Sequence, residues 1–255
     1  MRAVRADLHL HTCLSPCGDF DVTPAAVVGR AAELGLGLIA ICDHNSAENV
    51  AAALVAARRL GPSAPHVLAG LEVTTAEEAH VLTLFDDLKA ALTMQAMVFD
   101  HLQKEPNDPD IFGMQIVANA DDEVEYFNPR LLIGATDLAV SEVARRTHEL
   151  GGLLVAAHID RPSYSLVGQL GLIPPDLPLD AVEISRAGDP AQADRWLMGA
   201  RLPVLTSSDA HFLRDVGAAW TELELARPCL AELALALAGQ GGRRVLGHGR
   251  REGGA

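Results

Sequence analysis

The chain has 255 residues and a formal net charge of -14, and its core must be aliphatic because aromatic residues make up only 4%. Its apolar runs are too short to span a bilayer, and the N-terminus lacks the apolar core of a signal peptide, so we expect a cytoplasmic protein with no membrane partner. Four cysteines are too few for a disulfide scaffold, and the acidic balance argues against general nucleic-acid binding.

Short β-like runs alternate with Ala- and Leu-rich stretches, which predicts βα units around a mostly parallel sheet. The expected strands are Ala3–His9, Leu38–Asp43, His66–Glu72, His80–Phe85, Leu153–His158, Ala181–Ser185, Val204–Ser208 and Ala219–Leu223. The expected helices are Pro24–Gly35, Ala47–Leu60, Asp86–Gln103, Glu142–Leu150 and Pro228–Ala238. Thr23, Ser46 and Ser141 are suited to begin the first, second and fourth of these helices.

Residues 106–137 interrupt this alternation. Ile116–Ala118 and Val124–Phe127 flank a polar turn, which predicts a hairpin within an insertion that lies over the functional site. We expect residues 1–225 to form the main unit, with this insertion, and residues 226–255 to add a C-terminal helix and a tail. The Gly- and Arg-rich Gly239–Ala255 is expected to be frayed.

The strongest local motif is Asp7-Leu8-His9-Leu10-His11, at the end of the first expected strand. Alternate residues of a strand share a face, so these three polar side chains are expected to point the same way. Two imidazoles at this spacing can bind one divalent ion, and Asp7 could orient a ligand from behind. The alternative is an exposed polar face of the strand.

Other residues of metal-ligand type also lie where an apolar strand meets a loop. In α/β barrels the C-terminal ends of the strands converge on one face, where active sites are built. A single histidine at such a place is more often structural, but several in one chain predict a shared metal site. They are Asp43, His44, Glu72, His80, His158, Asp209 and His211.

The ordered motifs H-x-H, D-H, G-x-E, a later H and D-x-H, which span Asp7 to His211, resemble those of the PHP (polymerase and histidinol phosphatase) family of metal-dependent phosphoesterases. The resemblance implies a distorted (β/α)7 TIM-like barrel with two or three divalent metal ions. It assigns one metal to His9, His11, Glu72 and Asp209, a second to His44 and His211, and a third to Glu72, His80 and His158.

One motif departs from the family pattern. Many relatives carry Asp or His five or six residues after the second histidine of H-x-H, where this chain has Pro16 and Cys17. A Cys17 thiolate would be a reasonable ligand and would favour zinc or iron over magnesium, with manganese also considered. The alternative is that Cys17 packs in a turn while Asp19 or water serves as the ligand.

Arg161, three residues after His158, is a candidate for a forked contact with phosphate oxygens, although it could instead pair with Asp160. Arg186 and Asn45 are further candidates for substrate contact. We assign catalytic roles to Arg161, Asp209 and His211.

The resulting hypothesis is a hydrolase of phosphoric ester bonds. It would cleave a small phosphomonoester, such as a nucleotide or nucleoside bisphosphate, by means of a hydroxide bridging two metals. The partner is then expected to be a small phosphorylated substrate, with no stable nucleic-acid partner. The alternatives are a histidinol-phosphate phosphatase, a short-oligonucleotide exonuclease and a non-catalytic metal-binding regulatory domain.

Overall fold

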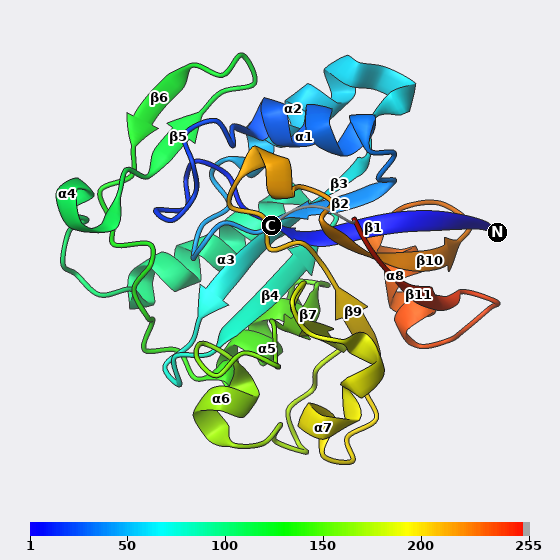
Figure 1. Ribbon diagram of the computed structural model, residues 1–255. Helices are drawn as coiled ribbons and strands as arrows, with labels where there is room; N and C mark the ends of the chain where they lie inside the picture. Colours follow the sequence, from blue (N-terminus) through cyan, green and yellow to red (C-terminus); the bar gives the residue numbers. More distant parts are fainter. Residues whose placement is uncertain (252–255) are drawn as a thin grey trace.

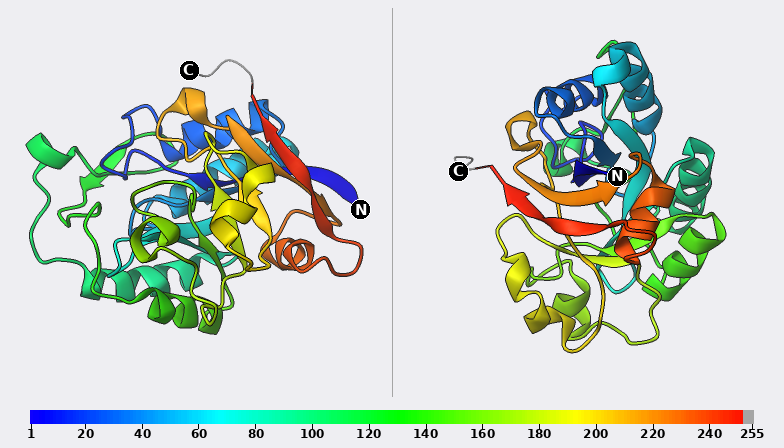
Figure 2. Two further views of the ribbon diagram at one scale, coloured as in Figure 1. Left: turned by 60° about the horizontal axis from the view of Figure 1, so that its bottom comes forward. Right: turned by 90° about the vertical axis from the view of Figure 1, so that its right-hand side faces the viewer.

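The structure is a computed structural model that describes residues 1–251. Nine strands form one curled sheet in the order β11-β10-β1-β2-β3-β4-β7-β8-β9 (Figures 1 and 2). These strands are β1 (Arg2–Leu10), β2 (Leu38–Ile41), β3 (His66–Thr74), β4 (His80–Phe85), β7 (Leu153–Ala156), β8 (Ala181–Ile184), β9 (Val204–Thr206), β10 (Ala219–Leu225) and β11 (Arg244–Arg250). All eight strands expected from the sequence are present, within a few residues of the expected ends.

The sheet combines parallel and antiparallel pairs. The runs β1-β2-β3 and β7-β8-β9 are parallel, whereas β4 is antiparallel to both of its neighbours and β10 is antiparallel to β1. The Thr221 hydroxyl joins β10 to β9, because it accepts from Thr206 N at 2.8 Å and donates to Thr206 O at 2.9 Å. The sheet is nearly closed, and the prediction of a distorted TIM-like barrel is confirmed.

Helices cover the outside of this sheet, except that α8 (Leu230–Leu237) packs against its inner face (Figure 2). The α-helices are α1 (Pro24–Glu33), α2 (Val50–Leu60), α3 (Leu88–His101), α4 (Pro109–Phe112), α5 (Val140–Glu149), α6 (Leu166–Leu170), α7 (Asp194–Leu197) and α8 (Leu230–Leu237). Thr23 caps α1 as expected, whereas α2 begins later than expected because Gln95 accepts hydrogen bonds from Ser46 Oγ and Ala47 N. Ala139, not Ser141, is the N-cap residue of α5. Within residues 1–251, no helix is both long and apolar enough to cross a membrane.

Buried apolar side chains form two clusters on opposite faces of the sheet. The outer cluster lies between the strands and helices α1, α2, α3 and α5. The inner cluster joins side chains from strands around the barrel to one face of α8, including Leu68, Leu82, Val155 and Leu233. The barrel interior is therefore an aliphatic core, as the scarcity of aromatic residues requires.

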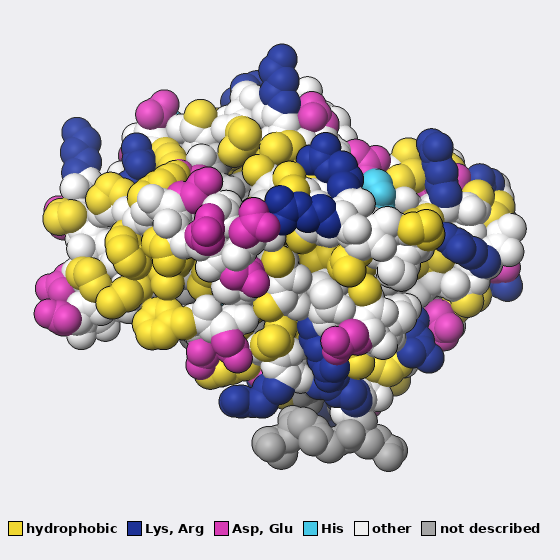
Figure 3. Space-filling view, turned by 90° about the horizontal axis from the view of Figure 1, so that it is seen from above, with side chains coloured by type: hydrophobic (Ala, Val, Ile, Leu, Met, Phe, Trp, Pro, Cys, Tyr) yellow, Lys and Arg dark blue, Asp and Glu magenta, His cyan; other side chains and the backbone are white. Residues whose placement is uncertain are grey.

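The insertion contains the expected hairpin, formed by β5 (Ile116–Ala118) and β6 (Val124–Phe127). Asn49 holds β5 by donating to Ile116 O at 3.0 Å and accepting from Ala118 N at 3.0 Å. The insertion exposes large apolar side chains among acidic ones, on the left of the face in Figure 3. The exposed apolar residues are Ile111, Phe112, Met114, Val124, Tyr126 and Phe127.

The C-terminal segment differs from the expectation of a frayed tail. Residues 244–250 form β11, which pairs with the edge of β10 and half-buries Val245. The edge of β10 offers unpaired backbone groups, and pairing with β11 satisfies them. Residues 252–255, also part of that prediction, lie outside the described residues. The division of the chain after residue 225 stays a prediction.

Candidate metal centre

The H-x-H motif lies at a break in the regular pleat of β1. The register between β1 and β2 shifts between Asp7 and Leu10, so Leu8 belongs to the inner cluster and Leu10 to the outer one. Strict alternation predicted that His9 would share the environment of Asp7, but the register shift separates the two side chains. Asp7 instead accepts hydrogen bonds from Ser208 N, Ser208 Oγ and Gly217 N, and so fixes the loop that carries Asp209.

Six of the ten histidines gather around the Glu72 carboxylate at the end of β3. Five of their rings lie within 3.3 Å of its oxygens, and all five residues are buried. The distances are 3.3 Å for His9 Nε2, 3.3 Å for His11 Nε2, 3.0 Å for His44 Nδ1, 2.8 Å for His80 Nδ1 and 3.2 Å for His158 Nε2.

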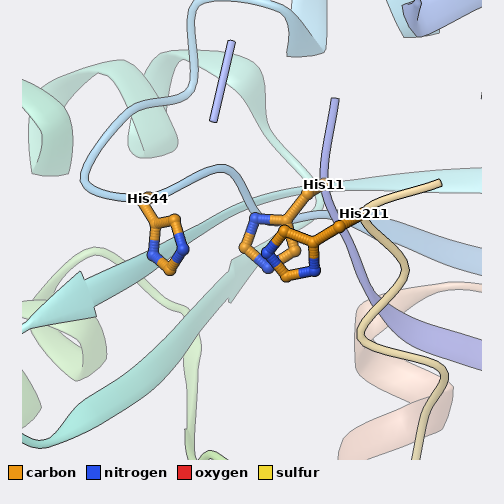
Figure 4. A group of neighbouring side chains, drawn as sticks. All are labelled: His11, His44 and His211. Atoms are coloured by element: carbon orange, nitrogen blue, oxygen red, sulfur yellow. The ribbon is translucent and has the colours of Figure 1, made fainter. Parts of the chain in front are cut away.

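The sixth ring, that of His211, lies over the ring of His11 with a centroid separation of 4.0 Å, and His44 lies beside them (Figure 4). Asp209 completes the cluster, since its Oδ1 lies 3.2 Å from His11 Nε2 and 3.5 Å from His9 Nε2. Three overlapping groups have ligand atoms close enough to share one ion. They are His9-His11-Asp209, His11-His44-His211 and His44-Glu72-His80.

The close approach of β2 and β3 explains the glycine of the G-x-E motif. A Cβ atom at Gly70 would lie 2.6 Å from Cys42 Sγ and 3.0 Å from Ile41 O, both closer than van der Waals contact allows. Gly70 therefore lets β3 run close to β2, and this places Glu72 at the centre of the histidine cluster.

Buried polar side chains behind the cluster orient two of its rings. Glu183 at the end of β8 lies 3.0 Å from His9 Nδ1, which leaves Nε2 facing the centre. Ser15 Oγ lies 2.9 Å from His11 Nδ1 and donates to Asp43 Oδ1 at 2.7 Å. Such partners fix the ring and raise its basicity in metal sites. Glu183 was missed as a site residue, although its place at the end of an expected strand could have indicated it.

The buried carboxylates of the cluster favour positive charge on their neighbours, and the pKa values show this. Burial raises the pKa of Glu72, but His80 and His9 outweigh this effect and hold the pKa well below its ordinary value. Burial lowers the pKa of His9, but Glu183 and Glu72 hold it well above that of a free imidazole. Burial also lowers the pKa of His11, but hydrogen bonds with Asp209 and Glu72 raise it to about 9.

Two of the rings that line the pocket behave differently. Burial, only partly offset by Glu72, lowers the pKa of His80 to about 4. Burial and the neighbouring His11 lower the pKa of His211 to about 3. These two imidazoles are therefore neutral at pH 7 and carry free lone pairs, which is the form of histidine that binds a metal ion.

The residues present fit divalent cations. Nδ1 of His44 and Nδ1 of His80 face Glu72, but neither makes a hydrogen bond of acceptable geometry within the described residues. Glu183 Oε2, which is also buried, has no hydrogen-bond partner there either. Buried polar atoms without partners are rare unless an ion or water satisfies them. Cations would satisfy these atoms and balance the buried carboxylates together.

The centre opens into a pocket of about 200 Å³. Arg161 lies at this pocket, and its Nη2 donates to Asp209 Oδ2 at 2.5 Å, whereas Asp160 bonds to Ser185. The alternative pairing of Arg161 with Asp160 is thus not observed. The pocket is lined by His44, Glu72, His80, Ile133, His158, Arg161, Tyr164, Asp209 and His211.

Two of the predicted substrate contacts lie elsewhere. Asn45 is fully buried, and its Nδ2 donates to the carbonyls of Leu132 and Gly134 while its Oδ1 accepts from Thr74 N. Its amide holds the insertion beside the pocket, and substrate contact by Asn45 stays a prediction. Arg186 pairs with Asp215 at 2.9 Å and does not line the pocket.

The ligand expected after H-x-H is not decided by the geometry. Cys17 is exposed and belongs to none of the three groups that could share an ion within residues 1–251, although it contributes to the pKa of His44. Burial lowers that pKa, and Glu72 and Cys17 outweigh burial and raise it to about 9. Asp19 Oδ1 accepts from Asp21 N at 3.4 Å. Ligation by Cys17 stays a prediction.

A barrel whose strand ends gather six imidazoles around two carboxylates defines a protein of the metal-binding hydrolase class. The family model of the PHP domain matches residues 7–166, and that of a PHP-associated region matches residues 191–239. The chain belongs to the PHP family, as its motifs predicted.

The chain is similar to proteins that act on nucleic acids. It is 29% identical over 182 residues to the 5'-3' exoribonuclease Rnm of Escherichia coli, with 68% of this chain and 58% of that protein covered. Its fold matches the lesion-specific endonuclease PfuEndoQ of Pyrococcus furiosus with a TM-score of 0.70 and 20% identity, over 97% of this chain and 58% of that one.

An endonuclease Q bound to a 27-mer duplex with an abasic lesion also matches, with a TM-score of 0.70 and 20% identity, over 96% of this chain and 59% of that one. The chain thus spans less than two thirds of the length of these relatives. The prediction of a small substrate with no nucleic-acid partner is contradicted by them. Net charge was a poor guide because a substrate responds to local charge, not to the sum over the chain.

Proposed function

We propose that this protein is a metal-dependent hydrolase that cleaves phosphoester bonds in a nucleic acid. The observation that carries the proposal is the cluster of six histidines around Glu72 and Asp209, with Arg161 at the mouth of the same pocket. Membership of the PHP family and the similarity to Rnm and endonuclease Q support it. The short-oligonucleotide exonuclease considered from the sequence falls within this proposal.

The distribution of charge is compatible with such a substrate. Residues 1–185 contain 11 Lys and Arg against 26 Asp and Glu, whereas residues 186–251 contain nine against seven. The acidic excess therefore lies in the first part of the chain. In Figure 3, many Lys and Arg side chains lie on the centre, right and lower parts of the face, and a few also stand at the upper left. A polyanion could approach the pocket from the less acidic side.

We propose two or three divalent ions for this centre. His9, His11 and Asp209 would hold one, His44 and His211 a second, and Glu72, His80 and His158 a third, with Glu72 shared. Imidazole-rich sites suit zinc or iron better than magnesium, and the carboxylates Glu72 and Asp209 keep manganese as a further candidate. Cys17 would add a ligand to the second ion. When bound, the ions would supply an activated water and neutralise charge on the phosphoryl group.

The protein side chains would orient the substrate and control protons. Arg161 presents a planar fork to phosphate oxygens, and its pairing with Asp209 holds that fork at the pocket. Glu183 would hold the proton on His9 Nδ1 so that Nε2 stays free for a ligand role. His211, neutral and at the pocket, would offer a lone pair to the second ion.

The test is a hydrolysis assay on the metal-loaded and the chelator-treated protein. The substrates are single-stranded RNA, single-stranded DNA, a duplex with an abasic site and a nucleoside bisphosphate. We expect metal-dependent cleavage of at least one polynucleotide. Cleavage of the bisphosphate alone would contradict the nucleic-acid substrate, and no metal-dependent cleavage of any of the four would contradict the hydrolase.

A further inference from the structure

Tyr164 lies at the mouth of the pocket and stacks on a residue of the histidine cluster. It follows Arg161 in the loop between β7 and α6, and its ring centroid lies 5.0 Å from that of His80 with the planes 26° apart. The residue is 50% exposed, although it lines the same pocket as Glu72 and Arg161. One face of its ring is therefore covered by His80, and much of the remaining side chain is open to solvent at the pocket.

The backbone of Tyr164 is in a conformation that a bulky residue rarely adopts. Its φ is +55°, in the left-handed region that favours glycine. The carbonyl of Tyr164 accepts from His80 N at 3.0 Å, and the next residue, Ser165, caps α6 and donates to Arg161 O at 2.6 Å. These contacts impose the backbone conformation but do not require a tyrosine side chain.

A strained residue whose side chain is not needed for the local fold indicates a functional requirement for that side chain. Asp209 and His158, both in the histidine cluster, also have positive φ values, of +50° and +30°. Tyr164 shares this strain, and its ring stacks on the outer side of the cluster against His80.

We propose that Tyr164 is a substrate-binding residue that stacks a nucleobase next to the phosphate held at the metal centre. This inference rests on the proposed function. Arg161 and Tyr164 would bind adjacent parts of one nucleotide, its phosphate and its base. Ile133 also lines the pocket and would give the base an apolar contact. Every base has a π face, so this site would select a nucleoside without selecting a sequence.

The experiment compares the wild type with Tyr164→Gly and Tyr164→Phe. Each is assayed on an oligonucleotide and on the same oligonucleotide with the bases beside the scissile bond removed. Glycine removes the ring and relieves the strain, whereas phenylalanine keeps the ring as a matched control. Metal content and Tm are measured for all three proteins.

On the intact oligonucleotide we expect Tyr164→Gly to raise KM by about 10- to 100-fold, the range that loss of one base stack produces, with kcat changed little. On the abasic substrate, wild type and Tyr164→Gly should have similar KM values, and Tyr164→Phe should resemble the wild type on both. The Tm of Tyr164→Gly should equal or exceed that of the wild type.

An equal loss on both substrates, or a fall in metal content, would show a structural role and overturn the inference. An unchanged KM on the intact oligonucleotide would also overturn it, while leaving the proposed hydrolase function intact. Failure of the wild type to cleave either substrate would instead overturn the proposed function and the inference that rests on it.

Discussion

The two ends of the barrel interior are built from the same strands but from opposite kinds of side chain. At one end, imidazoles and carboxylates from β1, β3, β4 and the loops after β7 and β9 converge on Glu72. At the other end, the strands contribute aliphatic residues that pack against α8. On β3 the two kinds are only four residues apart, since Leu68 belongs to the inner apolar cluster and Glu72 to the metal centre.

The difference between the two ends separates stability from chemistry. The aliphatic end gains free energy from burial alone. The polar end buries carboxylates that need balancing charge, so it is expected to gain stability only when cations or protons supply that charge. Substitutions at one end should therefore change properties that substitutions at the other end leave alone, and four predictions test this separation.

The largest effect is expected for Glu72→Ala, because Glu72 contacts five imidazoles. We expect hydrolysis to fall by more than the roughly 100-fold that loss of a supporting partner can cost, together with lower metal content. Kinetics and elemental analysis on the same preparation measure both. Full activity with normal metal content would refute the proposed role of Glu72.

The second effect concerns the aliphatic end. Leu233 on α8 is fully buried in the inner cluster, so Leu233→Ala should lower the free energy of unfolding by about 2–5 kcal/mol. Denaturant unfolding measures this loss. Metal content and kcat of the folded variant should match the wild type, and a loss of either would show that the two ends are not separable.

The third effect is expected for Glu183→Gln, which keeps the size of the side chain that supports His9 but removes its charge. Metal affinity or activity should fall by about 10- to 100-fold, with little change in fold. Titration of the metal-free protein measures the affinity. Glu222→Gln is a control that should leave the affinity unchanged, because Glu222 is half-buried on β10 and belongs to none of the three groups that could share an ion within residues 1–251.

The smallest effect concerns Glu232, whose carboxylate accepts from Arg243 Nε at 3.0 Å and Arg243 Nη2 at 2.8 Å. Hydrogen bonding to Arg243 and to Ala226 N lowers the pKa of Glu232 to about 2. A lowered pKa stabilises the fold fully above the ordinary glutamate pKa, and this contribution is lost as the pH falls toward 2. Glu232→Gln should therefore lower Tm at pH 7 by less than Leu233→Ala does.

The pH dependence provides the check on this last prediction. The gap in Tm between wild type and Glu232→Gln should narrow as the pH is lowered from 5 to 3. A gap that stays constant over this range would mean that the charge of Glu232 does not contribute. Metal content should not change with this substitution at pH 7.

Much of the fold could be predicted because its signals are local. Apolar runs ending in polar residues indicated the strands, and Thr23 followed by Pro24 indicated the start of α1. The start of α2 could not be predicted, because Gln95, on another helix, binds the residues before it. The pairing of β11 was missed for a similar reason, since an Arg- and Gly-rich segment shows little tendency to form a strand without the edge of β10.

The candidate site shows the same limit. Histidines and acids at strand ends were visible in the sequence, and the structure brings His9, Glu72, His158 and Asp209 together. The roles of Asp7 and Asn45 depended on a register shift and on the course of the insertion, neither of which has a local signal. Tyr164 was missed because only its backbone conformation and its place at the pocket set it apart.

The order of strands in the sheet has a consequence for folding during synthesis on the ribosome. β1 lies between β2 and β10, and Arg2 pairs with Leu225. One edge of β1, the first strand to be synthesised, therefore stays unpaired until β10, one of the last strands, has been made. At ordinary translation speeds this interval is roughly 10 to 40 s. The H-x-H strand therefore leaves the ribosome long before its partner exists, and loading of ions can be completed only after the rest of the barrel has been synthesised.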